Sequence, residues 1–273
     1  MKDLAGKTAV VTGGGSGIGR GTVLALAEAG MNVIVADINE ESASAVATEV
    51  GTRALPVRAD VADRDSVEAL AERAYSEFGA VHVLHNNAGI ALFIPIAEMK
   101  DIDWRWTLSI NLEGVINGLQ AFLPRMRAQD EEAHIVNTAS MAGMLAGPRL
   151  GAYNASKFAV VAISETLRAE VAGEGIGVSV LCPGVVSTNI IQNTLRDRPA
   201  GGGDMNLGNF DGTALRGIAP EEVGQMVRHA IEHNEPYIFT HPEFEAMVRA
   251  RFERILAGFE YAKARDGAGS TTP

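Results

Sequence analysis

Short apolar runs alternate with segments of helical periodicity along most of this 273-residue chain. Each run is rich in Val, Ile, Leu or Ala and is bounded by Gly, Pro, Asp or Asn. Continuous apolar runs of this length are typical of strands buried on both faces of a parallel sheet. The expected strands are 7–12, 32–37, 54–60, 81–86, 133–140, 177–183 and 236–240.

The segments between these runs predict helices, and Pro124 is expected to kink or break the longest of them. The expected helices are 16–29, 40–50, 63–78, 102–129, 151–172, 220–233 and 242–259. Strands that alternate with helices form right-handed crossovers and hence parallel sheets. The sequence therefore predicts an α/β fold, a single Rossmann-type doubly wound parallel sheet of about seven strands with helices on both faces.

No internal repeat or linker divides the chain, so we expect one domain over residues 1–265. The long irregular segment of about 184–219 is predicted to be a substrate lid, because loops of that length in compact domains are usually functional or disordered. Residues 266–273 are expected to form a disordered tail.

The charge of the chain excludes several classes of partner. A formal net charge of −11 argues against binding to nucleic acid or to an anionic membrane surface. The single cysteine, Cys182, cannot form an intramolecular disulfide, which favours a reducing compartment. The first apolar run is too short for a secretion signal, and no later run could span a bilayer. We expect a cytoplasmic protein with a small-molecule partner.

A glycine-rich stretch, TGGGSGIG at 12–19, joins the first strand to the first helix. Glycines there let the backbone approach a pyrophosphate, and the helix N-terminus favours its charge. The alternative interpretation is that these glycines only form a tight turn between the strand and the helix. Asp37 ends the second strand, where a carboxylate binds the ribose hydroxyls of NAD and repels the 2′-phosphate of NADP. Ser16 stands where a phosphate-binding arginine would lie, so the sequence favours NAD; an ordinary helix N-cap is the alternative for Asp37.

These motifs occur in a characteristic order. The pattern T-G-x-x-x-G-x-G, the NNAG at 86–89 and the YNASK at 153–157 make the chain similar to the short-chain dehydrogenase/reductase superfamily, up to about residue 240. The resemblance implies an NAD(P)-dependent enzyme. The cofactor-binding residues that it implies are Gly13, Ser16, Gly17, Ile18, Gly19, Asp37, Asp60, Val61, Asn87, Ala88, Gly89, Tyr153, Lys157, Val186 and Thr188.

Tyr153 and Lys157 are four residues apart and so share a helix face. A nearby ammonium lowers the pKa of a phenol, as a proton acceptor near neutral pH requires. If these two residues stood alone, we would interpret them as a surface pair on a helix. However, Ser140 ends the fifth strand nearby in the sequence, where its hydroxyl can join them. The resemblance implies that Tyr153 is the general acid/base, that Ser140 binds the reacting oxygen and that Lys157 binds the nicotinamide ribose.

The resemblance also assigns Asn111, in SINLEGV, to a proton relay through water, with an Asn merely tolerated in a helix as the alternative. Cys182 is expected to be buried with a raised pKa rather than a nucleophile. The stretch HAIEH at 229–233 fits the H-x-x-E-H zinc pattern, but without a further ligand or a catalytic role we interpret it as a solvated helix face and predict no metal. His82 and His85 are expected to be strand residues.

Apolar residues point to a hydrophobic substrate. They comprise Met205, Leu207 and Phe210 in the lid and Phe93, Met141, Met144 and Leu145 beside the site. The stretches INGLQAFLPRM and YIFTHPEFEAMVRARFERI resemble the branch of lignin-derived aryl-ether Cα-dehydrogenases, which oxidise a benzylic secondary alcohol to a ketone.

The predicted function is NAD-dependent interconversion of a hydrophobic, aryl secondary alcohol and its ketone. A cyclic alcohol, steroid or acyl substrate is an alternative, as is a non-catalytic NAD-binding regulator; a methyltransferase is disfavoured by the Tyr/Lys pair. The resemblance implies a homo-oligomer, a dimer or a homotetramer, formed through the helices that hold Asn111 and Tyr153.

Overall fold

The computed structural model describes residues 1–205 and 217–268. It divides into two compact units, Met1–Thr240 and His241–Pro273. The first unit contains one parallel sheet whose strand order is β3-β2-β1-β4-β5-β6-β7. The strands are β1 (Thr8–Thr12), β2 (Asn32–Asp37), β3 (Ala54–Arg58), β4 (Val83–Asn86), β5 (Ala133–Thr138), β6 (Ile176–Cys182) and β7 (Tyr237–Phe239). The expected Rossmann-type sheet is confirmed.

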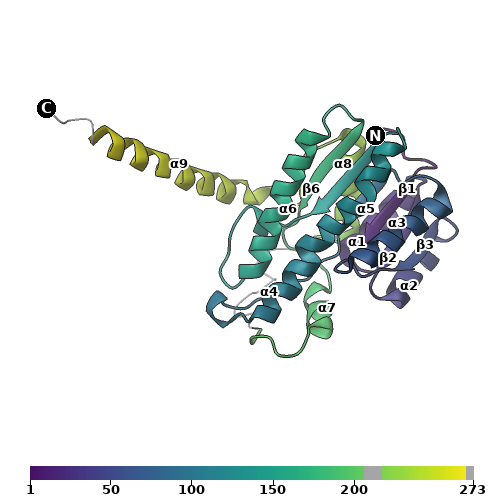
Figure 1. The fold of residues 1–273 in the computed structure, drawn as a ribbon, viewed down its shortest axis with the longest axis horizontal. Coiled ribbons are helices and arrows are strands. Elements are labelled where there is room, and N and C mark those ends of the chain that lie inside the picture. The colour runs from purple at the N-terminus through teal and green to yellow at the C-terminus, as the bar shows by residue number, and fades with distance from the viewer. Residues whose placement is uncertain (206–216, 269–273) are drawn as a thin grey trace. The chain divides into compact units, whose positions relative to one another are not determined.

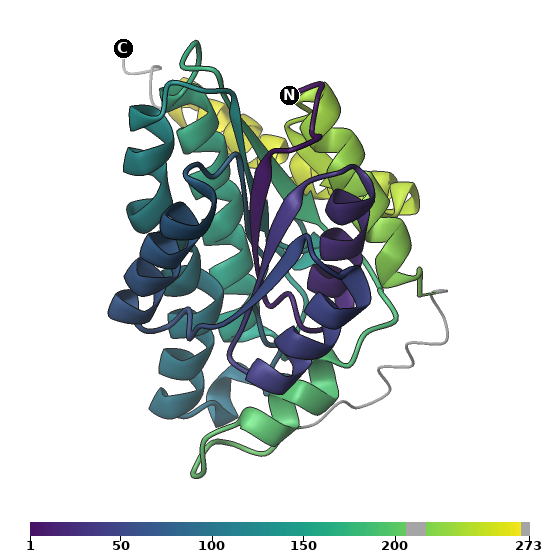
Figure 2. The ribbon, with the colours of Figure 1, turned by 90° about the vertical axis from the view of Figure 1, so that its right-hand side faces the viewer.

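Helices cover both faces of this sheet (Figures 1 and 2). The α-helices of the first unit are α1 (Gly17–Glu28), α2 (Glu40–Val50), α3 (Arg64–Phe78), α4 (Asp101–Leu108), α5 (Gly114–Ala128), α6 (Gly151–Glu170), α7 (Ile190–Asp197) and α8 (Pro220–His233). Two short 3₁₀ turns, η1 (Ile96–Glu98) and η3 (Met141–Gly143), and a π-helical turn, η2 (Ser109–Glu113), lie between them.

The two faces of the sheet carry separate apolar cores. One core joins the sheet to α3, α5 and α6 through side chains such as Leu70, Phe122 and Leu167. The other joins it to α1, α2 and α8 through side chains such as Leu26 and Val227. Because the central strands are buried on both sides, they read as continuous apolar runs, which is why the sequence located them so well.

The predicted long helix over 102–129 is wrong in one respect. Pro124 lies inside α5 and does not end it, and the Arg125 guanidinium donates to the Ala121 carbonyl one turn earlier. The helical segment changes geometry at η2 instead, where α4 gives way to α5. A π-helical turn has no simple composition signal, whereas a proline does, and so the sequence directed the expectation to the wrong position.

The described parts of the segment 184–219, residues 184–205 and 217–219, are also more ordered than an irregular loop. They contain α7, and Val186 bridges Ile218 where the segment returns to the sheet. Arg198 and Asp103, both largely buried, form an ion pair at 2.7 Å, and Asp103 also accepts from the Gly203 N–H at 2.8 Å. This pair ties the segment after α7 to α4. Leu207 and Phe210 lie outside the described residues.

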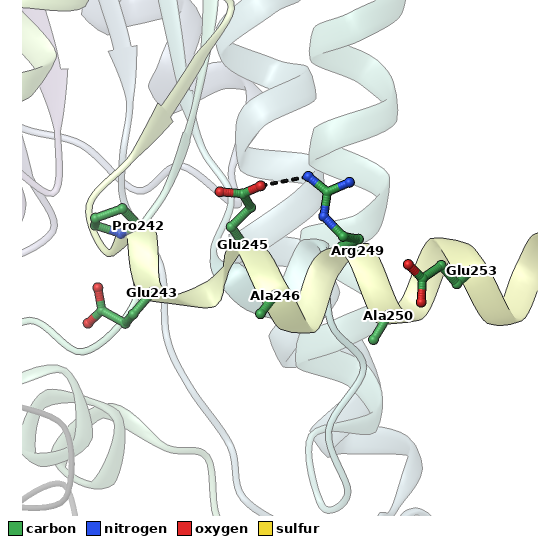
Figure 3. A pocket seen from close by; sticks show the side chains of 7 residues that line it. All are labelled: Pro242, Glu243, Glu245, Ala246, Arg249, Ala250 and Glu253. Carbon is green, nitrogen blue, oxygen red and sulfur yellow. Dashed lines mark hydrogen bonds and ion pairs between the residues drawn. The ribbon is translucent and has the colours of Figure 1, made fainter.

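The second unit consists of a 3₁₀ turn, η4 (Pro242–Phe244), and α9 (Glu245–Ala268). α9 is longer than expected and ends inside the segment predicted to be a disordered tail, while 269–273 lie outside the described residues. A shallow hollow of about 410 Å³ lies along its first turns, between Pro242 and Glu253 (Figure 3). Glu245 and Arg249 pair across it at 2.8 Å. Among the described residues, no helix is long and apolar enough to cross a membrane.

Close contact between α1 and α8 predicts a glycine requirement. A Cβ on Gly224 would collide with the Gly21 carbonyl of α1, whereas a Cβ on Gly258 of α9 would meet nothing within 4 Å. Gly224→Ala should therefore force the helices apart and lower the free energy of unfolding by about 1–3 kcal/mol.

Urea unfolding followed by circular dichroism measures this change. Gly258→Ala is the matched control, since the same substitution in an open helical position should be neutral or stabilise by up to about 1 kcal/mol. Equal unfolding midpoints for the two variants would contradict the packing argument.

Candidate active site

The turn between β1 and α1 brings the backbone close to the next strand of the sheet. Gly13 and Gly17 adopt φ values of +62° and +50°, which favour glycine. A Cβ on Gly13 would lie 2.9 Å from the Ala88 Cα, and one on Gly19 would collide with the Gly13 carbonyl. Ser16 is the N-cap of α1 but its side chain does not cap the helix, and Ile18 follows in the first turn. This is a helix N-terminus shaped for close approach of a phosphate.

A cluster of hydrogen bonds joins the ends of β1 and β4. The Thr12 hydroxyl accepts from the N–H groups of Asn87 at 2.9 Å and Ala88 at 3.1 Å. The Asn87 carboxamide donates to the Thr12 carbonyl at 2.9 Å. Asn87 and Ala88 were expected from the sequence to belong to the site, whereas Thr12, the first residue of the TGGG turn, was not.

Asp37 ends β2 beside the glycine-rich turn, as expected. Its carboxylate accepts from the N–H groups of Gly15 at 3.0 Å and Asn39 at 2.9 Å. Arg196 of α7 is close enough for Asp37 to help raise the pKa of its guanidinium, after the larger effect of Asp197. This basic neighbour could not be predicted from the sequence, because Arg196 is far from Asp37 along the chain.

Asp60 and Val61 follow β3 on the same edge of the sheet. The Asp60 carboxylate accepts from the Ala62 N–H at 3.0 Å, and the Val61 carbonyl accepts from Asn117 of α5 at 2.9 Å. Val61 is buried, and a Cβ on Gly114 would touch its side chain. Val61 thus packs against the start of α5, with Asp60 beside it.

Ser140, Tyr153 and Lys157 converge at the carboxyl edge of β5. The Tyr153 hydroxyl is hydrogen-bonded to the Ser140 side chain. Lys157 Nζ lies 5.7 Å from the centre of the Tyr153 ring and donates to the Thr138 carbonyl at 2.8 Å. Helical spacing on α6 thus places the phenol and the ammonium on one face, as the sequence predicted.

Burial dominates the electrostatics of this group. It raises the pKa of Tyr153 above the ordinary value, and the bond to Ser140 only partly opposes it. It lowers the pKa of Lys157 to about 8. The expectation of a lowered Tyr153 pKa is therefore wrong for the chain alone, because desolvation of the phenolate outweighs the hydrogen bond with Ser140.

Asn111 lies at the centre of the π-helical turn η2 and is fully buried. Its carboxamide accepts from the Ile90 N–H and donates to the Ile90 carbonyl, both at 2.9 Å. A Cβ on Gly89 would lie 3.2 Å from the Asn111 carboxamide and 3.6 Å from Lys157 Nζ. The site therefore brings Gly89, Asn111 and Lys157 together, with the Asn111 side chain bound to the backbone that follows β4.

The segment after β6 reaches back across the glycine-rich turn. A Cβ on Gly17 would lie 3.0 Å from the Thr188 methyl group, and the Thr188 N–H donates to the Val186 carbonyl. Further along, the buried Thr194 hydroxyl of α7 accepts from the Ala91 N–H at 3.1 Å. Thr188 thus lies against the glycine-rich turn, with Val186 two residues before it.

Buried histidines and Cys182 support the site without taking part in it. His85 Nε2 pairs with the Thr138 hydroxyl at 2.8 Å, and burial lowers its pKa to about 3, so the ring is neutral. Cys182 is fully buried, and burial raises its pKa to about 12. The prediction of a strand residue is confirmed for His85 but wrong for His82, which lies just before β4, and Cys182 is buried with a raised pKa, as expected.

The HAIEH stretch lies elsewhere, in the last turn of α8. His229 and His233 are exposed and their rings are stacked, with 3.9 Å between ring centres. Because α8 returns across the sheet before β7 begins, this turn lies at the amino edge of the strands. The cluster is therefore separate from the site at the carboxyl edge.

Strand order explains why these residues meet. The sheet reverses direction of growth between β1 and β4, and open α/β sheets bind ligands in the crevice at such a switch point. The site thus has the form of a dinucleotide-binding α/β oxidoreductase. A match to the short chain dehydrogenase family over residues 7–199 shows that the chain belongs to that family of oxidoreductases.

Individual relatives give the same result. A solved short-chain dehydrogenase/reductase from Burkholderia phymatum, in complex with NAD, superposes with a TM-score of 0.89 at 38% identity, covering 94% of this chain and 97% of that one. A C alpha-dehydrogenase from Sphingobium sp. is 32% identical over 94% of this chain and 87% of its own length.

One relative is much longer than this chain. The probable oxidoreductase EphD of Mycobacterium tuberculosis is 37% identical over 87% of this chain, which spans 41% of that protein's length.

The raised pKa of Cys182 predicts an unreactive thiol. In the native protein at pH 8, a thiol-specific disulfide reagent should modify Cys182 only at the rate of unfolding, because the thiol is both buried and protonated. Stoichiometric modification in denaturant is the control. Rapid modification of the native protein would contradict the burial and the protonation described here.

Proposed function

We propose that this chain is an NAD-dependent dehydrogenase that interconverts a hydrophobic, aryl secondary alcohol and its ketone. The observation that carries the proposal is the convergence of Ser140, Tyr153 and Lys157 at the carboxyl edge of the sheet. Membership of the family and the NAD complex of the Burkholderia relative support the choice of cofactor.

The residues at the switch point fit a dinucleotide. Gly13 and Gly19 leave the backbone bare where α1 begins, which suits a pyrophosphate, and Asp37 offers a carboxylate to the ribose of the adenosine half. Lys157 would hold the nicotinamide ribose. When bound, NAD supplies the acceptor for the hydride that leaves the carbinol carbon.

Tyr153 exchanges the proton in this proposal. In alcohol oxidation the substrate hydroxyl gives its proton to the Tyr153 oxygen as the C–H bond gives up a hydride, and Ser140 holds the same substrate oxygen by a hydrogen bond. In the reverse direction the phenol donates. The raised pKa of Tyr153 favours the proton-donating form, and the adjacent Lys157, when protonated, offsets the cost of the phenolate.

Asn111 takes a positioning role in this scheme. Because its carboxamide is bound to both backbone groups of Ile90, we assign the predicted water relay to the backbone of η2, where the π-helical geometry departs from the regular ladder. The side chain fixes that turn next to Lys157.

Apolar side chains beside Ser140 support a hydrophobic substrate. Met141 and Phe93 are buried, Met144 and Leu145 are half-buried, and the Ile94 N–H donates to the Arg149 carbonyl just before α6. The similarity to the Sphingobium C alpha-dehydrogenase favours an aryl alcohol within this class.

Formation of NADH from a panel of secondary alcohols tests the function directly. We expect turnover with benzylic aryl-glycerol ethers and little with polyols, because the residues beside Ser140 are apolar. Cyclic alcohols and steroids are included in the panel. Turnover confined to these would replace the aryl assignment, and failure of every alcohol and ketone with both cofactors would contradict a dehydrogenase.

Tyr153→Phe tests the proton step. The variant keeps the ring but loses the hydroxyl, so kcat should fall by about 10²–10⁴-fold or more while NAD still binds by fluorescence titration. Tyr75→Phe is the matched control, since the Tyr75 hydroxyl bonds to Gln129 far from the site. Near-normal turnover by Tyr153→Phe would show that another group moves the proton.

Asp37→Ala tests the cofactor preference. Loss of the carboxylate should raise KM for NAD and lower KM for NADP, because the charge that repels a 2′-phosphate is removed and Arg196 remains nearby. The ratio of kcat/KM for the two cofactors is the measurement. An unchanged ratio would show that Asp37 serves only to hold Gly15 and Asn39.

A further inference from the structure

The last turn of α8 carries a cluster of possible metal ligands at the edge of the sheet opposite the proposed active site. His229, Glu232 and His233 each offer a donor atom, and these atoms lie within 4.8 Å of one another. His229 and His233 are four residues apart and their stacked rings project from one face of the helix. A small rotation of exposed side chains brings such donors to the separation that a single ion requires.

The hydrogen bond of His233 fixes which ring nitrogen is free. Its Nδ1 lies 2.8 Å from the His229 carbonyl oxygen. A carbonyl can only accept, so Nδ1 carries the proton and the lone pair is on Nε2. Metal-ligating histidines commonly donate their second nitrogen to a backbone carbonyl in this way. This hydrogen bond therefore orients the His233 ring and leaves Nε2 free to bind a metal ion.

Two carboxylates add negative charge at the cluster. Arg228 Nε donates to one oxygen of Glu232 at 2.9 Å, which orients the carboxylate and leaves its other oxygen for a ligand bond. The Glu235 carboxylate lies 3.4 Å from His229 Nε2, on the link between α8 and β7, and is not one of the three donors that lie within 4.8 Å of one another. The C-terminal end of a helix also favours a cation, because its last carbonyls carry partial negative charge. Glu235 thus adds charge beside the site, a neighbour that the sequence did not reveal.

We propose that His229, Glu232 and His233 bind one Zn²⁺ ion, with the Glu235 carboxylate beside them. Two imidazole nitrogens with a carboxylate oxygen suit zinc and its late first-row neighbours, whereas Mg²⁺ prefers an octahedron of oxygens. The ion binds the folded chain and so stabilises it, and it takes no part in the reaction at the opposite edge.

Calorimetric titration of the tag-free protein with zinc chloride tests the proposal. We expect one Zn²⁺ per chain, a higher temperature of unfolding with zinc, and no heat from magnesium chloride at the same concentration. The site fails if zinc binds without defined stoichiometry or leaves the unfolding temperature unchanged.

Single-site variants locate the ion. His229→Ala and His233→Ala should each weaken zinc binding by about tenfold or more and abolish the thermal shift, since loss of supporting groups alone costs about 10–100-fold. Gln225→Ala, an exposed change one turn earlier on α8, is the matched control and should bind zinc normally. Both histidines are exposed, so the zinc-free variants should unfold at the wild-type temperature. Wild-type affinity in both histidine variants would overturn the assignment.

Discussion

The hydrogen bonds that Thr12 makes with Asn87 and Ala88 hold the ends of β1 and β4 together, and the placement of the site depends on them. These strands are neighbours in the sheet but are separated in sequence by two complete strand–helix units. Thr12 fixes where the glycine-rich turn begins, and Asn87 fixes where the chain leaves β4. Gly89 and Ile90 follow in the chain: Ile90 is hydrogen-bonded to Asn111, and Gly89 lies close to Asn111 and Lys157.

Burial gives the site its second constraint. Lys157 is almost completely buried, and its ammonium donates a hydrogen bond to the Thr138 carbonyl. The Thr138 hydroxyl is in turn hydrogen-bonded to the His85 ring. An amine in such surroundings holds its proton less firmly than in water, and a phenol holds its proton more firmly. The pKa values of the two groups therefore move apart, so the phenol keeps its proton in the chain alone and formation of the phenolate depends on nearby positive charge.

The central parallel strands were predictable because they are buried on two faces, and the residues at their ends followed directly. Asp37, Asn87 and Ser140 could be located as strand-end residues without a structure. The contribution of α7 could not, because Arg196 and Thr194 reach the site through a crossing that no local pattern encodes. The pKa of Tyr153 was misjudged for a related reason: spacing reveals a charged neighbour but says nothing of how much water the fold removes.

The π-helical turn between α4 and α5 has a consequence for how this chain can tolerate insertion and deletion. Such a turn holds one residue more than the α-helical path would, so α4 keeps its register relative to α5 although one more residue separates them. A further residue inserted within Ser109–Glu113, which the turn does not absorb, would rotate α4 by about 100° about its axis. Asp103 would then face away from Arg198 and Gly203, and the segment after α7 would lose its tether. Deleting a residue would instead leave α4 in place and remove the turn that holds Asn111.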